Sequence, residues 1–384
     1  MSQTPLVLHL IPTLAMAGAE RVVIELAARL PEEGFRTKII ALFEGGSFAD
    51  DLRRRDIRWT QLLSSNAGSR MELLSRLNGL MRDDARGPAI IHTHLFGGDF
   101  YGALAKRLSH GRVTAPLIST AHNIDHDDST LRRLARRWAV RQMDQVVAIS
   151  GAVARYEKRN LGVREDRIQV IPNGVELSRI TKRHLRPFHD IPRLLCVGRL
   201  EAQKGHAILL NALANVPPPW MLEIVGTGSL ERDLRELAER LGIASRVHFL
   251  GEQRDVHEQR YAEADLFCFP SQWEGMGLVL AEAMAAGVPI LASNLPAIRE
   301  YASASRLVDP ASIDDWTAAI RDTLADPASA IATAQKAEPG IRKKFGLEQM
   351  VSSYADLYRQ IIRGPSSSHP TRRSTSRRHH AAHS

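Results

Sequence analysis

Short apolar runs alternate with longer amphipathic runs along most of the chain. In the first half, the runs that we predict to be buried strands are residues 6–11, 37–43, 89–94, 116–122, 145–150 and 167–171. Residues 19–30, between the first two, carry apolar side chains at helical spacing. A strand, a helix and another strand in this order indicate a parallel sheet, so residues 1–175 are predicted to form an α/β domain.

The same order of elements begins again after residues 176–192, a charged segment with prolines that we interpret as a linker. The predicted strands of the second half are residues 194–199, 221–225, 246–250, 264–269 and 288–293. A helix over residues 313–324 is expected to close this second domain, residues 193–345. An amphipathic helix at residues 346–362 follows, and residues 363–384 form a tail.

Residues 270–287 combine the end of a strand, a loop with two glycines and a glutamate, and an alanine-rich helix that stops at Gly287. Free N–H groups at a helix N-terminus attract anions, and glycine lets the backbone approach a ligand. Glu274 would repel a phosphate, so we expect it to contact a neutral group with hydroxyls. With Glu282 further along the helix, the pattern fits a ligand with a central phosphate and hydroxyls on both sides, such as a nucleotide-sugar.

Two cations follow the first strand of the second half. Arg199 and Lys204 lie beside Gly205, where they could clamp a diphosphate, because charge-assisted bonds to phosphate are strong. The alternative is a solvated basic loop. Gly18, just before the first helix, is a second turn that could face an anion.

Two histidines stand at predicted strand ends. In an open parallel sheet, ligands bind beyond the carboxyl ends of the strands, which is where His94 and His122 would lie. We therefore treat both as candidate functional residues, with His94 on the acceptor side. Other histidines are interpreted as structural.

The composition of the chain indicates the compartment in which the protein functions. Of the net charge of +8, five positive charges are arginines of the tail, which has no acidic residue and is expected to be disordered. We expect no specific nucleic-acid partner. Cys196 and Cys268 fall in apolar runs and are interpreted as buried thiols. No apolar run is long enough to span a membrane, and residues 6–17 lack the basic start of a signal peptide, so a cytoplasmic location is expected.

Residues 131–141 are rich in arginine. On a helix, their arginines would cover about half of the circumference, with Leu131, Leu134, Ala135 and Trp138 on the other half. The favoured interpretation is a surface helix that packs this apolar half on the sheet. The alternative is a basic face that binds anionic lipid head groups on the inner face of the membrane.

Taken together, these motifs resemble the retaining glycosyltransferases of family 4, over about residues 5–362. In the second half they are Gly198-Arg199-Leu200, Lys204-Gly205, Val225-Gly226-Thr227-Gly228, Ala264-Asp265, Pro270-Ser271, Glu274-Gly275-Met276-Gly277-Leu278 and Glu282-Ala283. In the first half they are Gly18-Ala19-Glu20, Ser119-Thr120-Ala121-His122 and Ile171-Pro172-Asn173-Gly174-Val175.

The resemblance implies a GT-B fold: two Rossmann-like domains that face each other across a cleft, with the last helix crossing back to the first domain. It implies that the second domain holds a nucleoside-diphosphate sugar. By this resemblance, Arg199 and Lys204 neutralise the diphosphate, and Gly18 brings the backbone close to it. Glu274 with Gly275, Met276, Gly277 and Leu278 contacts the sugar and the phosphate, and His122 contacts the sugar. Glu282 contacts the ribose, and residues 251–254 contact the base.

The implied reaction transfers the sugar to an acceptor hydroxyl with retention of configuration. Arg199, Lys204 and the helix N-terminus would stabilise the charge that grows on the leaving phosphate, so no metal or other cofactor is expected. Neither phosphate loop contains an Asp-x-Asp run. Whether Glu274 acts as a nucleophile or the acceptor attacks from the front face stays open. The acceptor is expected to be lipid-linked or a saccharide, in cell-envelope or exopolysaccharide synthesis; the base and the sugar are undetermined.

The sequence departs from the family pattern at two places. Residues 16–18 read Met-Ala-Gly where relatives often have paired glycines, and Met276 replaces a commonly aromatic residue.

Several other functions were considered. A metallohydrolase would use His92, His94, His122, Asp125 and His126, but Ile124 stands where a second histidine is needed. A nucleotide-dependent oxidoreductase fails at Glu231, which replaces the third glycine of a motif starting at Gly226. A sugar-nucleotide epimerase or a non-catalytic GT-B scaffold is the remaining alternative.

Overall fold

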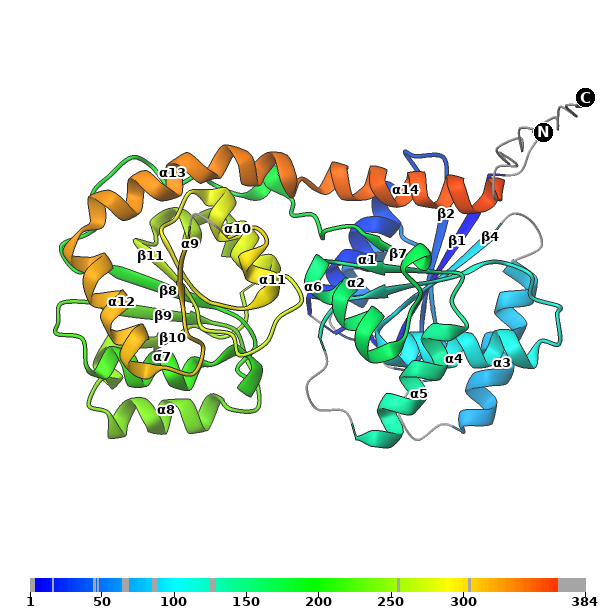
Figure 1. Cartoon of the computed structure of the whole chain (residues 1–384), viewed down its shortest axis with the longest axis horizontal. Coiled ribbons are helices and arrows are strands. Elements are labelled where there is room, and N and C mark those ends of the chain that lie inside the picture. The colour runs from blue at the N-terminus through cyan, green and yellow to red at the C-terminus, as the bar shows by residue number, and fades with distance from the viewer. Residues whose placement is uncertain are drawn as a thin grey trace, which may run out of the picture.

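Two parallel β-sheets form the centres of two lobes that lie side by side (Figure 1). The first sheet has seven strands in the order β3-β2-β1-β4-β5-β6-β7, and the second has six in the order β10-β9-β8-β11-β12-β13. In each sheet the first three strands extend in one direction from the middle and the later strands in the other. The two halves therefore share one Rossmann-like topology, which confirms the predicted fold class.

The structure is a computed structural model that describes residues 4–364 except 16, 44–45, 47, 64–68, 85–88, 125–128, 254–255 and 303–304. Several sequence predictions fall on residues outside this set: Met16 of the first glycine loop, Asp125 and His126 of the rival metal pattern, Arg254 of the base loop, and tail residues 365–384.

The strands and helices of each half have the following bounds. The first half contains β1 (Leu6–Ile11), α1 (Gly18–Arg29), β2 (Arg36–Ala41), α2 (Ala49–Arg54), β3 (Trp59–Gln61), α3 (Arg70–Asp84), β4 (Ala89–His94), α4 (Leu95–Leu108), β5 (Leu117–Ala121), α5 (Thr130–Arg141), β6 (Gln145–Ala148), α6 (Gly151–Tyr156) and β7 (Ile168–Val170). The second half contains β8 (Arg193–Val197), α7 (His206–Ala214), β9 (Met221–Val225), α8 (Glu231–Arg240), β10 (Val247–Phe249), α9 (Val256–Glu263), β11 (Leu266–Phe269), α10 (Leu278–Ala286), β12 (Ile290–Ser293), α11 (Pro296–Arg299), β13 (Arg306–Val308), α12 (Ile313–Ala325), α13 (Pro327–Lys344) and α14 (Leu347–Arg363).

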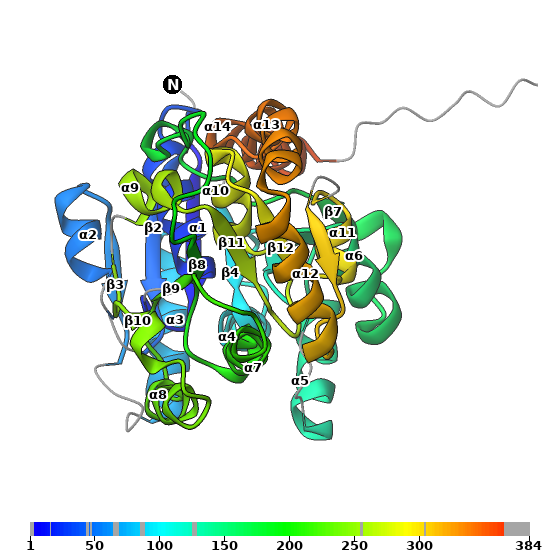
Figure 2. The ribbon, with the colours of Figure 1, turned by 90° about the vertical axis from the view of Figure 1, so that its left-hand side faces the viewer.

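Helices cover both faces of each sheet. In the first domain, α1 and α14 pack on one face, while α3, α4 and α5 pack on the other. In the second, α7, α8 and α12 cover one face, and α9 and α10 cover the other (Figure 2). Because helices cover both faces, β1 and β4 are buried at every position; β1 is apolar apart from His9, whereas β4 also buries His92, Thr93 and His94.

Most strands end one or two residues before the predicted ends. The run predicted at 145–150 ends as a strand at Ala148, yet Ile149 and Ser150 are still buried. The run predicted at 37–43 ends at Ala41, with Leu42 fully buried beyond it. The residues that follow these strands are covered although they are not in the sheet, so hydrophobicity alone overestimates strand length.

One long helix was not predicted. Between the helix predicted at residues 313–324 and the predicted end of the second domain at residue 345 lies α13, which has 18 residues and contains Pro339. Proline and a following glycine argue against a helix in the sequence. Pro339 lies on the exposed side of α13, where water can meet the lost backbone hydrogen bond. Figure 1 shows α13 over the second lobe and α14 over the first, along one edge of the molecule.

The chain crosses between the domains twice, and the two crossings lie together. The amide of Val175, on the way to the second domain, donates to the carbonyl of Phe345, on the way back, at 2.8 Å. Beyond this point α14 buries Tyr354 and Tyr358 against the first domain. A cluster of buried apolar residues also spans both domains, including Ile149 and Val153 from the first and Met276 and Ile298 from the second.

The orientation of α5 differs from the prediction. Leu131 and Leu134, expected to pack on the sheet, are 78% and 58% exposed. Arg136, expected on the basic face, is buried and forms an ion pair with Glu157 at 2.9 Å. Glu157 offsets part of the cost of burying this arginine, whereas the sequence spacing alone places it outside.

None of the helices in the described part of the chain combines the length and the apolar character that crossing a bilayer requires. Both cysteines are free and buried, as predicted.

Candidate active site

The site forms where the two sheets present their topological switch points to each other. In the first sheet the strand order reverses between β1 and β4, and in the second between β8 and β11. Ligands of such sheets bind beyond the carboxyl ends of the strands at this point. His94 is the last residue of β4, and the segments that follow β1, β8 and β11 contain Gly18, Arg199 and Glu274; all four were predicted from the sequence as site residues.

Two helix N-termini meet across the domain boundary. Gly18 begins α1, and a side chain at this position would lie 3.5 Å from Leu278, which begins α10. Neither helix has a capping side chain, and the first intrahelical bond of α10 comes from the amide of Leu280. The earlier amides of both helices can therefore bind an anion, and their dipoles add positive potential at the same place.

Glycines let the loop before α10 pack closely. Gly275 has the backbone of His122 next to it: a Cβ at this position would come within 2.4 Å of the His122 carbonyl oxygen. The hydroxyl of Ser150, also in the first domain, donates to the carbonyl of Gly275 at 2.7 Å. The side chain of Met276 is buried, and its carbonyl oxygen accepts a hydrogen bond from Tyr301. Its backbone N–H is therefore the group that can bind a ligand.

Lys204 and Glu274 form an ion pair. The Lys204 Nζ lies 2.8 Å from Glu274 Oε2, and both side chains are less than one-fifth exposed. The lysine stem runs over Gly198 and its ammonium group lies over the ring of Phe269. The turn is set by Gly205, whose φ is +65° and where a Cβ would lie 2.0 Å from the carbonyl oxygen of Pro270. The structure thus brings together the cation and the carboxylate that the sequence predicted separately.

Arg199 reaches toward the first domain. Its guanidinium group bonds Gln203 at 3.4 Å. Burial raises the pKa of Glu20, and the positive charge of Arg199 partly offsets this effect. Glu20 belongs to α1, so a cation of the second domain and a buried carboxyl group of the first face the same space.

Glu282 is less accessible than a direct ribose contact would need. It is 1% exposed, its Oε1 lies 2.8 Å from the guanidinium group of Arg21, and its Oε2 accepts from the hydroxyl of Tyr261 at 2.9 Å. Burial, followed by the Glu282 carboxylate, raises the pKa of Tyr261, so this hydroxyl stays a donor. The sequence analysis missed Arg21 and Tyr261 as partners; Arg21 directly follows the Gly18-Ala19-Glu20 motif, which was the available signal.

A further interdomain contact lies at the N-terminus of α6. The carboxylate of Glu300 accepts from the amide of Gly151 at 2.7 Å and from Arg155 at 2.8 Å. The same helix is capped from within the first domain by Ser150, which accepts from the amide of Val153. A carboxylate from the second domain therefore neutralises the N-terminus of a helix of the first.

The two predicted histidines are in contact, but only one lies near the loop. His122 is partly exposed and follows β5, whereas His94 is fully buried behind it, with its Nδ1 3.1 Å from His122 Nε2. A direct acceptor contact from His94 is therefore not supported. Burial lowers the pKa of His122 to about 3 and that of His94 well below its usual value, so both rings are neutral near pH 7.

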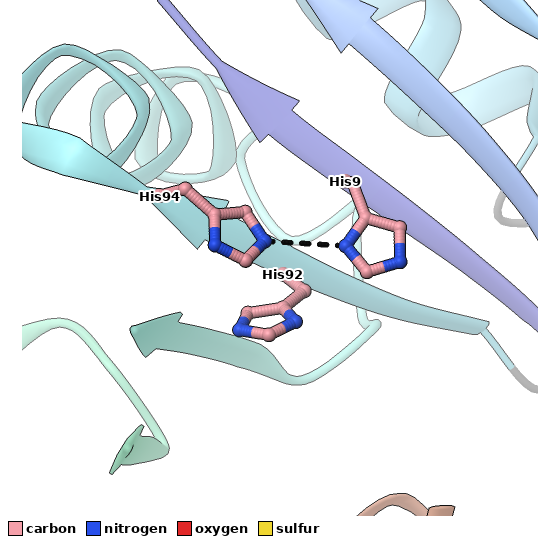
Figure 3. A group of neighbouring side chains, drawn as sticks. All are labelled: His9, His92 and His94. Atoms are coloured by element: carbon pink, nitrogen blue, oxygen red, sulfur yellow. Dashed lines mark hydrogen bonds between the residues drawn. The ribbon is translucent and has the colours of Figure 1, made fainter. Parts of the chain in front are cut away.

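His9, His92 and His94 form a buried cluster from β1 and β4 (Figure 3), and their ring nitrogens lie close enough together to suggest a metal site. Hydrogen bonds account for these nitrogens in another way. His92 uses both of its own, with Tyr358 at 2.6 Å and Thr120 at 2.8 Å, while His9 Nδ1 bonds His94 Nε2 at 3.2 Å. The donor set therefore fits a hydrogen-bonded network better than a cation site.

Comparison with known proteins identifies the family. The model of Glycosyltransferase Family 4 matches residues 16–179, and that of Glycosyl transferases group 1 matches residues 179–340. The D-inositol 3-phosphate glycosyltransferase of Rhodococcus opacus is 28% identical over 345 residues, which cover 78% of this chain and 76% of that protein. The lipopolysaccharide core biosynthesis mannosyltransferase LpsB of Rhizobium meliloti is 30% identical over 256 residues, 59% of this chain and 68% of that protein.

Solved structures show the same architecture. The crystal structure of Anabaena HepE in complex with UDP and glucose superposes with a TM-score of 0.81 at 21% identity, covering 92% of this chain and 98% of that one. A glycosyltransferase from Rickettsia africae superposes with a TM-score of 0.79 at 20% identity, covering 94% and 100%. The predicted GT-B fold is thereby confirmed, and the chain belongs to the group 1 and family 4 glycosyltransferases.

Proposed function

We propose that this glycosyltransferase is a retaining enzyme that moves a sugar from a nucleoside-diphosphate sugar to a hydroxyl group of a lipid-linked or saccharide acceptor, in cell-envelope or exopolysaccharide synthesis. The observation that carries the proposal is the meeting of two uncapped helix N-termini with Arg199 and Lys204 at the switch points of both sheets. Such a concentration of positive potential suits a diphosphate.

The ion pair of Lys204 and Glu274 suggests how the parts divide their work. When a donor binds, the ammonium group turns from the carboxylate to the diphosphate, and Glu274 is released to accept hydrogen bonds from sugar hydroxyls. Because the pair is already in place at 2.8 Å, little rearrangement is needed. His122 contributes from the opposite domain to the sugar and the reacting centre.

Charge stabilisation accounts for the chemical step. As the bond between the sugar and the phosphate breaks, negative charge grows on the leaving diphosphate, and fixed cations with helix amides stabilise it more than they stabilise the ground state. Arg199 and Lys204 supply this charge, so the proposed reaction needs no metal.

The donor base is proposed from the relatives. Because UDP is bound in the Anabaena structure, a uridine nucleotide is the first to test. On the ribose side, Glu282 can accept ribose hydroxyls only if Arg21 or Tyr261 gives up its bond. Donor binding would then be coupled to a change in an interdomain contact.

A panel of nucleotide-sugars, with and without lipid-linked and saccharide acceptors, tests the function. We expect release of the nucleoside diphosphate to depend on the acceptor, to persist after treatment with EDTA, and to give a product with the anomeric configuration of the donor by NMR. An inverted product would refute retention, and interconversion of donors without acceptor would indicate an epimerase. Loss of activity with EDTA that added metal restores would refute metal independence.

A membrane surface is proposed as a partner of the first domain. The exposed side of α5 carries Leu131 and Leu134 together with the exposed Arg133 and Arg137. Apolar side chains between cations are typical of helices that lie at an anionic interface. This arrangement would bring the acceptor side of the enzyme to a lipid-linked substrate.

A further inference from the structure

A chain of three histidines runs from the interior of the first domain to the active-site loop. His9 Nδ1 lies 3.2 Å from His94 Nε2, and His94 Nδ1 lies 3.1 Å from His122 Nε2. His9 and His94 are fully buried, and Figure 3 shows their rings joined by this hydrogen bond. Only His122, whose carbonyl adjoins Gly275, reaches the domain boundary.

The protons in such a chain can be ordered in only two ways. Burial lowers the pKa of His9 and of His122 to about 3, and that of His94 well below its usual value, so each neutral ring carries one N–H. Each hydrogen bond needs one donor and one acceptor, so fixing one ring fixes the others. Either all three rings are protonated at Nε2, or all three are protonated at Nδ1.

The two orders differ at the ends of the chain. Within the described residues, His9 Nε2 and His122 Nδ1 are buried atoms with no hydrogen-bond partner. Protonation at Nε2 would place an unpaired N–H on His9, inside the fully buried core. Protonation at Nδ1 would instead place it on His122, whose Nδ1 is also buried but belongs to a partly exposed residue beside the active-site loop, where a small shift of the ring brings it to water or to an incoming oxygen. An unpaired buried donor costs about 1–3 kcal/mol, and only the His122 end of the chain can be relieved of this cost, so the second order is favoured.

Neighbouring groups hold the chain in place. The ring of His92 packs against that of His94 with centroids 4.1 Å apart, and both nitrogens of His92 are held by Tyr358 and Thr120. This packing resists a flip of the His94 ring, which would put ring carbons in place of the two nitrogens that define the chain.

We propose that His9 and His94 are positioning residues that hold His122 as the Nδ1–H tautomer, so that His122 donates a hydrogen bond to an oxygen of the sugar or diphosphate of the donor substrate. The recipient of this bond rests on the proposed function, whereas the order of the protons does not. His94 thus acts on the reaction through His122, without touching the substrate.

Long-range proton–nitrogen NMR on the full chain, labelled with ¹⁵N-histidine, reads the tautomers directly, because protonated and bare ring nitrogens resonate far apart. His122 is assigned by the loss of its signals in His122→Gln. At pH 7.5 we expect His122 and His94 to be protonated at Nδ1 without any ligand. A His122 ring protonated mainly at Nε2, or an even mixture of tautomers, would overturn the proposal without reference to activity.

Matched variants test the cause. His94→Leu removes the donor to His122 and should produce mixed tautomers, whereas His94→Asn keeps an amide donor near the former Nδ1 and should restore the Nδ1–H form. Tyr358→Phe, which removes only the hydroxyl that bonds the neighbouring His92, should leave His122 unchanged. Should His94→Leu fail to fold, the parent spectrum and His94→Asn still decide; an unchanged His122 tautomer in a folded His94→Leu would contradict the role of His94.

Titration with UDP-glucose, or with the donor that the panel identifies, separates this inference from the proposed function. Binding of the donor substrate should shift the Nδ1–H signal of His122. His94→Leu should lower the affinity for this substrate by about two- to tenfold, and His94→Asn should restore the affinity. Binding that leaves the His122 signal in place would overturn the donated bond. Failure of every nucleotide-sugar to bind would overturn the proposed function and the recipient of the bond, while the tautomer order would stand on the ligand-free spectrum.

Discussion

Lys204 is the residue at which the active site can be tested most directly. Among the residues that the structure describes, its ammonium group has one carboxylate partner, Glu274, and both side chains are largely buried. In such a buried position, water screens the charge of the ammonium group less, so its attraction to a second anion is stronger than at the surface.

Replacing Lys204 with Ala should weaken the binding of UDP by roughly 10- to 100-fold, the value of one charge-assisted hydrogen bond. Calorimetry with the free nucleotide measures this without any acceptor. Lys106→Ala is the matched control, because Lys106 pairs with Asp144 on the surface of the first domain. Equal affinity for UDP in the two variants would remove Lys204 from the diphosphate site.

The two glutamates should respond differently to the same change. In the proposed function, Glu274→Gln removes the charge beside the reacting sugar and should lower kcat by at least about 100-fold. By the same proposal, Glu282→Gln affects the ribose side, far from the bond that breaks, and should raise KM for the donor by about tenfold with a smaller change in kcat. Steady-state kinetics distinguishes the two, and a fall in kcat for Glu282→Gln equal to that for Glu274→Gln would refute the division of roles.

At the scale of single elements, α5 shows how a buried ion pair can set the orientation of a helix. Its arginine-rich sequence suggests one basic half, but Arg136 turns inward to Glu157 and two leucines turn outward. The exposed surface is consequently mixed, with apolar side chains next to cations.

Removing this surface should reduce binding to membranes. Each cation near an anionic surface contributes about 1 kcal/mol, so Arg133→Gln with Arg137→Gln should lower binding to phosphatidylserine vesicles by roughly 30-fold at low salt. Leu131→Ser with Leu134→Ser should reduce it further. Arg136 is left intact, because its removal would strand Glu157.

The control carries the same loss of charge on the other domain. Arg232→Gln with Arg240→Gln changes two exposed arginines of α8. Cosedimentation of this control at the level of the parent, with loss only in the α5 variant, supports the surface. Equal sedimentation of both variants would refute it.

At the scale of the whole molecule, buried titratable groups link stability to pH. Burial lowers the pKa of His9 and His122 to about 3 and that of His206 to about 4, and lowers those of His92 and His94 well below the usual 6.5. Below pH 6.5 these histidines are therefore protonated in the unfolded chain but stay neutral in the folded chain. Each such histidine removes up to about 1.4 kcal/mol of stability per pH unit as the pH falls.

Three acids oppose this trend. Burial raises the pKa of Glu20, that of Asp99 to about 6 and that of Glu157 to about 7, so each of these groups binds more protons in the folded state than in the unfolded state as the pH falls toward about 4. Five histidines outweigh three carboxyl groups, and we expect the melting temperature to fall between pH 7.5 and pH 5. A constant or rising melting temperature in calorimetry would show that these histidines are not held neutral.

Asp99→Asn should isolate one of the opposing groups. Asp99 is an ionised, buried carboxylate near pH 7 that accepts from Thr93 and Ser119, and an amide oxygen can accept the same bonds. The substitution should therefore raise the melting temperature at pH 7.5 and have little effect at pH 4, where the carboxyl group is protonated in the folded protein.

The sequence by itself determined the two α/β halves, the last helix and the loops that carry the candidate site residues. These features depend on local patterns: apolar runs, helical spacing, and glycines next to cations and carboxylates at strand ends. Arg199, Lys204, Glu274 and Gly275 were found in this way, because their spacing along the chain is what the loop geometry requires.

Only the tertiary structure decided which side chains are paired. The bond between Arg21 and Glu282 joins residues 261 positions apart, and the ion pair of Arg136 reverses the expected faces of α5. The chain from His9 through His94 to His122 exists because β1, β4 and β5 are neighbours in space. Such contacts depend on how whole domains and sheets pack, and local sequence patterns do not encode this packing. The sequence therefore predicted the element or loop in which each residue lies, but not the side chain with which it pairs.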